Sequence, residues 1–310
     1  MGLEGPKVVI LLATYNGSEH IREQLDSLVL QTHANWSLIV SDDGSTDGTL
    51  EIVRKFAETI LQRVVIVEGP RGGFWKNFLS LIDQADQEQG DFFAFCDQDD
   101  IWLPEKLERV IKWLESVGQQ EPGLYCARTE LIDKAGTRIG FSPLFRRKPT
   151  FRNALVQSIA GGNTMVINRP TRALLAQTPK TADLISHDWW TYRLVTAAGG
   201  SVFYDPVPSV RYRQHSSNIV GSNRGIGPRI ARSMAFAGGR WKRWNDASLA
   251  ALGAIECSFS PSAQATIDDF SAARRSNLPD RIRLLWRSGV YRQNAIETIA
   301  MYLGAFLGRI

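Results

Sequence analysis

The chain has 310 residues, of which 44% are hydrophobic and 22% are charged, and its formal net charge is +4. This composition is ordinary for a globular protein, and the length is sufficient for a large core. No segment reaches the roughly 18 to 20 apolar residues that cross a bilayer, and the three cysteines lack the spacing of a zinc site. The N-terminus has no signal-peptide pattern, and Cys96 and Cys126 fall in strand-like runs. We therefore expect buried thiols and a cytoplasmic location.

Strand-like and helix-like segments alternate up to about residue 128, which favours an α/β fold with a mostly parallel sheet. Apolar runs predict strands at residues 7–13, 36–41, 64–67, 92–96 and 124–128. Apolar positions at helical spacing predict the intervening helices: Ile21, Leu25, Leu28 and Val29 behind a Ser18 cap; Leu50, Val53, Phe56 and Ile60; residues 74–82; and Leu107, Val110, Ile111 and Leu114. Asp133-Lys134-Ala135-Gly136 predicts a hairpin turn.

Two polar loops follow the first two predicted strands, Thr14-Tyr15-Asn16-Gly17 and Asp42-Asp43-Gly44-Ser45. Hydroxyl and amide groups of Thr14 and Asn16 suit a base or a ribose, and an Asp carboxylate accepts from a pyrimidine N3–H or from ribose hydroxyls. Alternatively, Asp42 and Asp43 only form a turn and cap a helix. A dehydrogenase would carry Gly-x-Gly-x-x-Gly after the first strand, and a sugar nucleotidyltransferase would carry a glycine-rich, arginine-containing loop there. Neither pattern is present.

The tetrad Asp97-Gln98-Asp99-Asp100 directly follows the strand predicted at residues 92–96 and precedes Pro104, which suits a first helical turn. Open α/β sheets bind ligands at the carboxyl ends of their strands. Like charges this close repel one another unless a cation or protons neutralise them. An Asp-x-Asp pair can share one divalent ion and leave positions open for phosphate oxygens. The alternative is a solvated acidic turn that caps the next helix.

Two further motifs lie in the second half. Ser186-His187-Asp188 opens a predicted helix, and Arg211, Arg213 and His215 share one face of a predicted strand because strand side chains alternate. Two guanidinium groups and an imidazole on one face suit a diphosphate and its metal, and a structural histidine is the alternative.

Two glycine-rich segments allow two interpretations each. Gly161-Gly162-Asn163-Thr164 lets an acceptor approach the backbone or packs tightly. Residues 221–228 close over the donor or act as a linker.

In this order, the motifs resemble those of family-2 glycosyltransferases with the GT-A fold. The resemblance rests on Thr14-Tyr15-Asn16, the Asp42-Asp43 loop, the acidic tetrad, His187-Asp188 and Arg213-Gln214-His215, and it covers residues 7–220. Phe95-Cys96-Asp97-Gln98-Asp99-Asp100-Ile101-Trp102, together with Gly73-Phe74-Trp75-Lys76-Asn77-Phe78, looks most like bacterial rhamnosyltransferase members.

This resemblance implies a GT-A domain at residues 1–220, with a nucleotide-binding half at 1–128 and an acceptor half at 129–220, followed by a helical extension at 221–310. It implies an inverting transfer that depends on Mn²⁺ or Mg²⁺, with Asp188 as the catalytic base. The expected metal ligands are Asp97, Asp99 and His215. The expected donor-binding residues are Thr14, Tyr15, Asn16, Asp42, Asp43, Asn77, Asp97, Arg211 and Arg213.

The same resemblance implies dTDP-L-rhamnose as the nucleotide-sugar donor and a hydroxyl of a lipid-linked surface glycan, such as that of lipopolysaccharide, as the acceptor. A UDP-hexose or UDP-N-acetylhexosamine donor stays open, as does a non-catalytic glycan-binding protein. The sequence shows no nucleic-acid-binding module.

Charge is divided unevenly along the chain. From residue 211 onward, 15 Lys and Arg stand against 6 Asp and Glu, a balance of +9, whereas the first 210 residues hold 21 and 26, a balance of −5. A basic region containing Arg240-Trp241-Lys242-Arg243-Trp244 is either a solvated surface or a peripheral contact with the inner face of the cell membrane. The last predicted helix, residues 295–307, packs its apolar face on the body or rests on a membrane; that face comprises Ile296, Ile299, Ala300, Leu303, Phe306 and Leu307.

Overall fold

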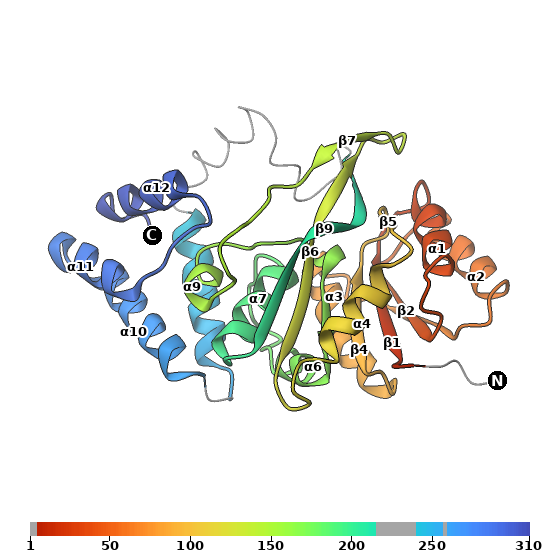
Figure 1. Cartoon of the computed structure of the whole chain (residues 1–310), viewed down its shortest axis with the longest axis horizontal. Coiled ribbons are helices and arrows are strands. Elements are labelled where there is room, and N and C mark those ends of the chain that lie inside the picture. Colours follow the sequence, from red (N-terminus) through yellow and green to blue (C-terminus); the bar gives the residue numbers. More distant parts are fainter. Residues whose placement is uncertain (1–4, 215–239, 257–258) are drawn as a thin grey trace.

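The computed structural model describes residues 5–214, 240–256 and 259–310 (Figure 1). Its centre is one sheet with the strand order β3-β2-β1-β4-β8-β6-β9-β5, and β7 pairs with β6 outside this path. The strands are β1 (Val8–Thr14), β2 (Trp36–Asp42), β3 (Val64–Glu68), β4 (Phe92–Cys96), β5 (Ile101–Trp102), β6 (Gly123–Ile132), β7 (Arg138–Phe141), β8 (Val166–Asn168) and β9 (Ser201–Arg213). The predicted α/β fold is confirmed. The first four strands are parallel, and antiparallel pairs involving β5, β7 and β8 make the whole sheet mixed.

Helices cover both faces of the sheet, and the side chains of β1 therefore alternate between two cores. Val8, Ile10 and Leu12 pack into a core that includes residues of α1 (Ile21–Val29), α2 (Thr49–Ala57) and α4 (Lys106–Leu114). Val9 and Leu11 pack into the opposite core, with residues of α3 (Phe74–Gln84), α6 (Arg169–Ala176) and α7 (His187–Ala197). The short helix α5 (Phe151–Ala154) also contributes to this second core.

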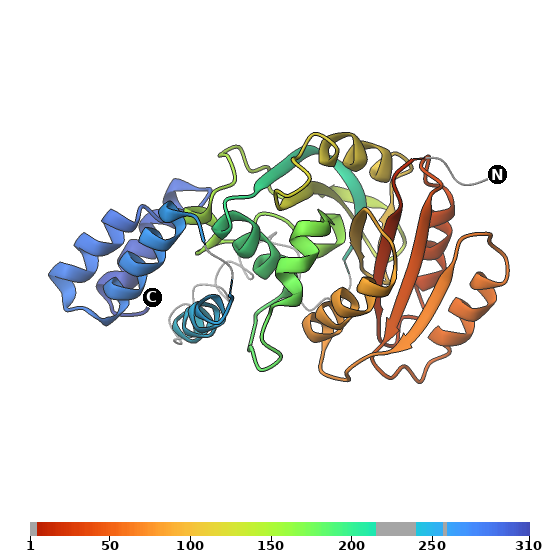
Figure 2. The ribbon, with the colours of Figure 1, turned by 90° about the horizontal axis from the view of Figure 1, so that it is seen from below.

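Four helices follow in the C-terminal region: α9 (Arg240–Gly253), α10 (Pro261–Arg275), α11 (Leu278–Ser288) and α12 (Ala295–Phe306). Their buried side chains, Trp241, Phe270, Leu285 and Met301, belong to the same core as α3 and α7. These helices (blue) lie at the end of the molecule opposite β1, β2 and β3 (Figures 1 and 2). Among the described residues, no helix has both the length and the apolar character needed to cross a membrane.

Local predictions near the site need two corrections. The α1 helix begins at Ile21 with His20 as its N-cap, while Ser18 donates its backbone N–H to Asp47, and Val29 is exposed. Residues 101–102 form β5 against β9, so that α4 begins at Lys106 and Pro104 lies before the helix. The predicted hairpin turn is confirmed, since β6 and β7 are antiparallel and Gly136 between them has a φ of +84°.

The last helix is confirmed, and of the two interpretations of its apolar face the packing on the body is wrong. All six apolar positions named for that face are exposed. The helix packs instead through Met301, Gly304 and Ala305. Because Gly304 and Ala305 are small, this other face of α12 can lie close to α11.

Candidate functional site

The loops predicted to form the site meet at the carboxyl edge of the parallel strands. Thr14, the last residue of β1, is the register partner of Asp42, the last residue of β2. On the other side of β1, Leu12 is the partner of Cys96, which ends β4 directly before the acidic tetrad. The start of α7 reaches the same edge, because the ring of its first residue, His187, lies 4.8 Å from the ring of Phe95 in β4.

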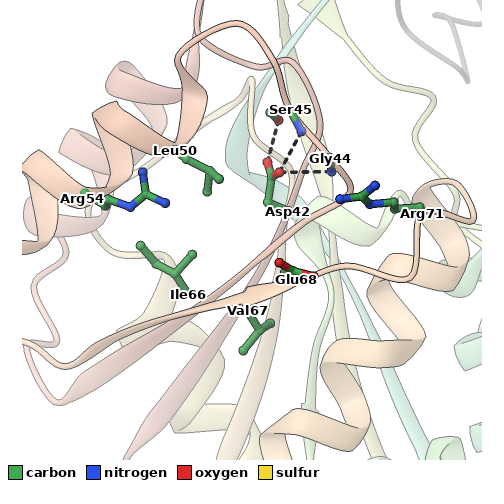
Figure 3. Close-up of a pocket in the computed structure, with 9 residues that line it drawn as sticks. All are labelled: Asp42, Gly44, Ser45, Leu50, Arg54, Ile66, Val67, Glu68 and Arg71. Carbon is green, nitrogen blue, oxygen red and sulfur yellow. Dashed lines mark hydrogen bonds between the residues drawn. The ribbon is translucent and has the colours of Figure 1, made fainter.

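Asp42 lies on the wall of a cavity of about 420 Å³ (Figure 3). Its carboxylate accepts hydrogen bonds from the N–H groups of Gly44 (3.1 Å) and Ser45 (2.8 Å) and from the Ser45 hydroxyl (2.5 Å). A carboxylate has about four acceptor positions, so one remains for a ligand. The other residues that line the cavity are Leu50, Arg54, Ile66, Val67, Glu68 and Arg71.

Asp43 holds the loop between β3 and α3. It accepts the N–H of Arg71 at 2.6 Å and the N–H of Gly73 at 3.0 Å. This contact brings Arg71 to the cavity wall, where the sequence analysis did not place it. Arg71 has a φ of +53°, which is uncommon for a residue with a side chain and shows that the loop is tightly constrained.

Asn77 is buried behind these loops and is not among the cavity-lining residues. Its side-chain amide donates to the carbonyl of Ser41 at 3.0 Å, and its Oδ1 has no hydrogen-bond partner among the described residues. In this structure Asn77 supports the end of β2, and its part in donor binding stays a prediction.

Gln98, which was not predicted as a site residue, joins the loop after β1 to the acidic tetrad. Its Oε1 accepts from the Thr14 hydroxyl (2.7 Å) and from the Tyr15 N–H (2.9 Å), and its Nε2 donates to the Tyr15 carbonyl (3.0 Å). The Tyr15 ring is exposed. Asn16 joins the same loop to the β2 loop, because its N–H donates to Ser45 and its Oδ1 accepts from Thr46.

Asp100 is fully buried and binds other residues inside the protein. Its Oδ2 accepts from the Asn163 side chain (2.5 Å) and its Oδ1 from the Arg213 N–H (3.1 Å). The ammonium of Lys106, also fully buried, donates to the Asn163 carbonyl and lies 3.5 Å from the centroid of the Trp102 ring. Neither Lys106 nor Asn163 was predicted for the site, because their role depends on contacts between distant segments.

Asp97 carries the clearest electrostatic signature of a ligand site. Desolvation, followed by the charges of Asp99 and Asp188, raises the pKa of its carboxyl to about 7. Within the described residues, no hydrogen bond reaches this carboxylate. Carboxylates in such an arrangement are destabilised as anions, and a divalent cation relieves that repulsion.

The donor set around Asp97 and Asp99 therefore fits a hard cation with oxygen ligands. No three His, Cys, Asp or Glu side chains form a complete metal cluster within residues 5–214, 240–256 and 259–310. His215, the third predicted ligand, lies outside the described residues. The metal site thus stays a prediction that rests on two carboxylates.

The two strand arginines differ in their surroundings. Arg211 is exposed and forms an ion pair with Glu130 at 3.4 Å. Arg213 is buried, and its guanidinium donates to the carbonyls of Asp99 and Lys134 and to the Glu23 carboxylate. These contacts make Arg213 a support for the acidic tetrad, and they favour Arg211 for contact with a phosphate.

Asp188 is the second residue of α7, and its Oδ1 accepts the N–H of Trp189 at 2.6 Å. Its neighbour His187 is buried between Phe78, at a ring-centroid distance of 3.9 Å, and Phe95, at 4.8 Å. Burial lowers the pKa of His187 to about 4, so the ring is neutral near pH 7. A side chain on Gly162 would overlap this ring, which supports tight packing there.

Comparison with known proteins identifies the family. Residues 9–172 match glycosyl transferase family 2. The chain belongs to this family. It is therefore a glycosyltransferase, and its sheet with C-terminal helices is a GT-A fold.

Two curated relatives illustrate the similarity. The dTDP-rhamnosyl transferase RfbG of Shigella flexneri is 31% identical over 248 residues, which cover 75% of this chain and 81% of that protein. The putative teichuronic acid biosynthesis glycosyltransferase TuaG of Bacillus subtilis (strain 168) is 31% identical over 167 residues, 53% of this chain and 63% of that protein.

Solved structures share the fold at lower identity. Residues 1–349 of TarS from S. aureus, in complex with UDP-GlcNAc, match with a TM-score of 0.56 and 18% identity, covering 97% of this chain and 82% of that chain. The mannosyltransferase PcManGT from Pyrobaculum calidifontis, in complex with GDP-Man and Mn²⁺, matches with a TM-score of 0.51 and 20% identity, covering 98% and 87%.

Proposed function

We propose that this glycosyltransferase is a metal-dependent, inverting enzyme that moves a sugar from a nucleotide-sugar donor to a hydroxyl of a glycan acceptor. One observation carries the proposal: the start of α7 lies against the end of β4, where the His187 ring is 4.8 Å from the Phe95 ring, so that Asp188 and Asp97 follow on neighbouring segments at one edge of the sheet. A transferase of this kind needs both a place for the diphosphate and a base beside it.

The nucleotide would occupy the cavity beside Asp42. The remaining acceptor position of Asp42 suits a pyrimidine N3–H or a ribose hydroxyl. Arg71 and Arg54 on the cavity wall add donors for carbonyl or phosphate oxygens. Gln98 holds Thr14 and Tyr15 in the neighbouring loop after β1.

Asp97 and Asp99 would hold Mn²⁺ or Mg²⁺. When bound there, the ion offsets the negative charge that grows on the leaving diphosphate. Asp100 stays outside this role, because its two oxygens already accept from Asn163 and Arg213. Arg211 is the exposed cation on β9 that can bind a phosphate oxygen.

Asp188 would take the proton of the acceptor hydroxyl as it attacks the sugar. Its bond to the Trp189 N–H fixes one oxygen and leaves the other free to accept. Attack by the acceptor in a single displacement inverts the anomeric carbon. His187 is neutral and enclosed by aromatic rings, so it positions the helix start and does not share the proton.

We propose dTDP-L-rhamnose as the donor and a lipid-linked surface polysaccharide as the acceptor. The support is the similarity to RfbG, which extends over most of both chains, and the rhamnosyltransferase-like segments around the tetrad and Asn77.

Calorimetry and turnover with a panel of donors test this proposal. With Mn²⁺ or Mg²⁺ present, we expect dTDP to bind more tightly than GDP, and dTDP-rhamnose to be consumed faster than UDP-galactose or UDP-N-acetylglucosamine. A clear preference for either UDP-sugar would reject the rhamnosyl donor and keep the transferase. Binding without hydrolysis or transfer of any donor, across an acceptor panel, would contradict the catalytic proposal.

A further inference from the structure

The last helix presents an apolar stripe that the rest of the described molecule leaves uncovered. Five large side chains of α12 and its C-terminal cap are between 57% and 76% exposed: Ile296, Ile299, Leu303, Phe306 and Leu307. Their spacing of three and four residues places them along one side of the helix. Single exposed apolar residues are common on proteins, whereas a contiguous stripe marks an interaction surface.

The opposite side of α12 fixes the helix to the body. Met301, Gly304 and Ala305 are buried, Tyr302 donates to the Leu285 carbonyl of α11, and Arg281 of α11 donates to the Ala305 carbonyl. The helix is therefore held with its most apolar side outward. A helix that merely completed the core would have turned that side inward, because burial of apolar surface is favourable.

The charge near the stripe is basic. Within α12 the single charged residue is Glu297, and Arg292 neutralises it at 2.9 Å. Arg309 follows the stripe directly and is exposed, and Arg281 lies at the same end of the helix. Residues 240–310 as a whole contain 10 Lys and Arg against 6 Asp and Glu, a net charge of +4. Exposed Trp286 on α11 adds an aromatic residue suited to a membrane interface.

We propose that the stripe of α12 inserts shallowly into the surface of a membrane that contains anionic lipid. An apolar helix face with arginines at one end is an arrangement that binds such a surface. A second copy of the chain fits less well. A standard protein interface uses about 20–30 residues from each partner, whereas this 12-residue helix offers five large side chains.

The position of the helix agrees with such contact. In Figure 1, β1 runs upward from the N-terminal side, and α12 is the uppermost of α10, α11 and α12. The stripe-bearing helix and the carboxyl edge of the sheet thus lie toward the same side of the molecule.

Sedimentation of the full-length protein with lipid vesicles tests the proposal. We expect binding to vesicles of equimolar phosphatidylcholine and phosphatidylglycerol, weaker binding in high salt, and little binding to phosphatidylcholine alone. The double variant Ile299→Ser/Leu303→Ser should bind roughly tenfold or more weakly, because two aliphatic side chains that would enter the lipid surface are lost. Arg309→Gln should weaken binding by about fivefold, the effect of one cation near an anionic surface.

A matched control separates the stripe from general stickiness. Leu30→Ser/Leu61→Ser removes two exposed leucine side chains at the other end of the molecule and should leave vesicle binding unchanged. Donor hydrolysis measured without vesicles should be the same in all variants. A variant that loses hydrolysis would therefore bear on the proposed reaction and not on membrane binding.

Three results would overturn the proposal. These are absence of wild-type binding to either vesicle, equal loss in the control, and a concentration-dependent dimer that Ile299→Ser/Leu303→Ser abolishes while vesicle binding persists. The last result would assign the stripe to a second copy.

Discussion

Two acidic loops flank β1 at the same edge of the sheet, yet the structure holds their carboxylates in opposite ways. Asp42 and Asp43 accept five hydrogen bonds between them, four from backbone N–H groups and one from the Ser45 hydroxyl. Within the described residues the Asp97 carboxylate accepts none, and its pKa is raised to about 7. In the sequence both loops are acidic segments that directly follow a strand, so the sequence alone does not distinguish them.

The difference separates carboxylates that build the site from those available for chemistry. An anion surrounded by N–H donors is stable by itself and fixes the loop that supplies the donors. An anion without donors requires a cation or a proton from outside. Four predictions test this distinction, from the largest expected effect to the smallest.

Asp99→Asn should lower transfer by roughly 10³-fold or more, because it removes a carboxylate proposed to hold the metal ion that offsets the charge of the departing diphosphate. Asp43→Asn is the matched change in the loop on the other side of β1. Its rate of transfer at saturating donor should fall far less. Steady-state transfer with and without a chelator measures both. Full wild-type activity in excess chelator would contradict the role of the metal.

Asp188→Asn should lower kcat by roughly 10² to 10⁴-fold and leave donor affinity within a few-fold, because the proposed base would act only as the acceptor attacks. Calorimetry with donor and turnover at saturation separate the two quantities. If donor binding collapses while saturated turnover survives, Asp188 binds the donor and is not the base.

Relative to Asp97→Asn, metal-free wild-type protein should lose stability as the pH rises from about 4 to about 7; the buried His187, whose lowered pKa changes stability with pH in the opposite direction, is present in both proteins. The folded-state pKa of Asp97 lies above its unfolded value, so its contribution is present at low pH and is lost as the carboxyl ionises. Asp97→Asn should lack this dependence, a difference of roughly 4 kcal/mol at neutral pH. Urea unfolding across the pH range measures it, and Mn²⁺ should restore wild-type stability. An identical slope in Asp97→Asn would assign the effect to another group.

Asp43→Ala should lower the free energy of unfolding by about 1–3 kcal/mol, because the N–H groups of Arg71 and Gly73 lose their acceptor. Asp26→Ala is the matched surface control: its carboxylate pairs with exposed Arg22, and the change should stay within about 0.5 kcal/mol. Equal effects in denaturant unfolding would show that the Asp43 contacts add nothing to stability.

The sequence predicted the parallel part of the fold because buried strands and amphipathic helices leave strong patterns. It placed the first four strands within a few residues and located the Asp97 tetrad at a strand end. It misplaced the start of α1, since a Ser beside a helix resembles a cap whether or not it bonds to the helix. It missed β5, because a strand of two residues is too short to show an alternating apolar pattern.

The site was predicted as a set of positions but not as a set of contacts. Gln98 reaches Thr14 across 84 positions in the chain, and Lys106 reaches Asn163 across 57. No local pattern reports such contacts. The same limit applies to α12, where the sequence showed an amphipathic helix but not which side the body covers.

The bond between Gln98 and the loop after β1 also has an evolutionary consequence. A Cβ atom on Gly17 would overlap the Gln98 side-chain amide, which occupies that space to reach Thr14 and Tyr15. Related sequences should therefore change these two positions together. A larger residue at position 17 is compatible with a shorter one at position 98, and such a pair would release the Tyr15 N–H to a ligand. Natural variation at position 17 thus predicts which relatives open this loop.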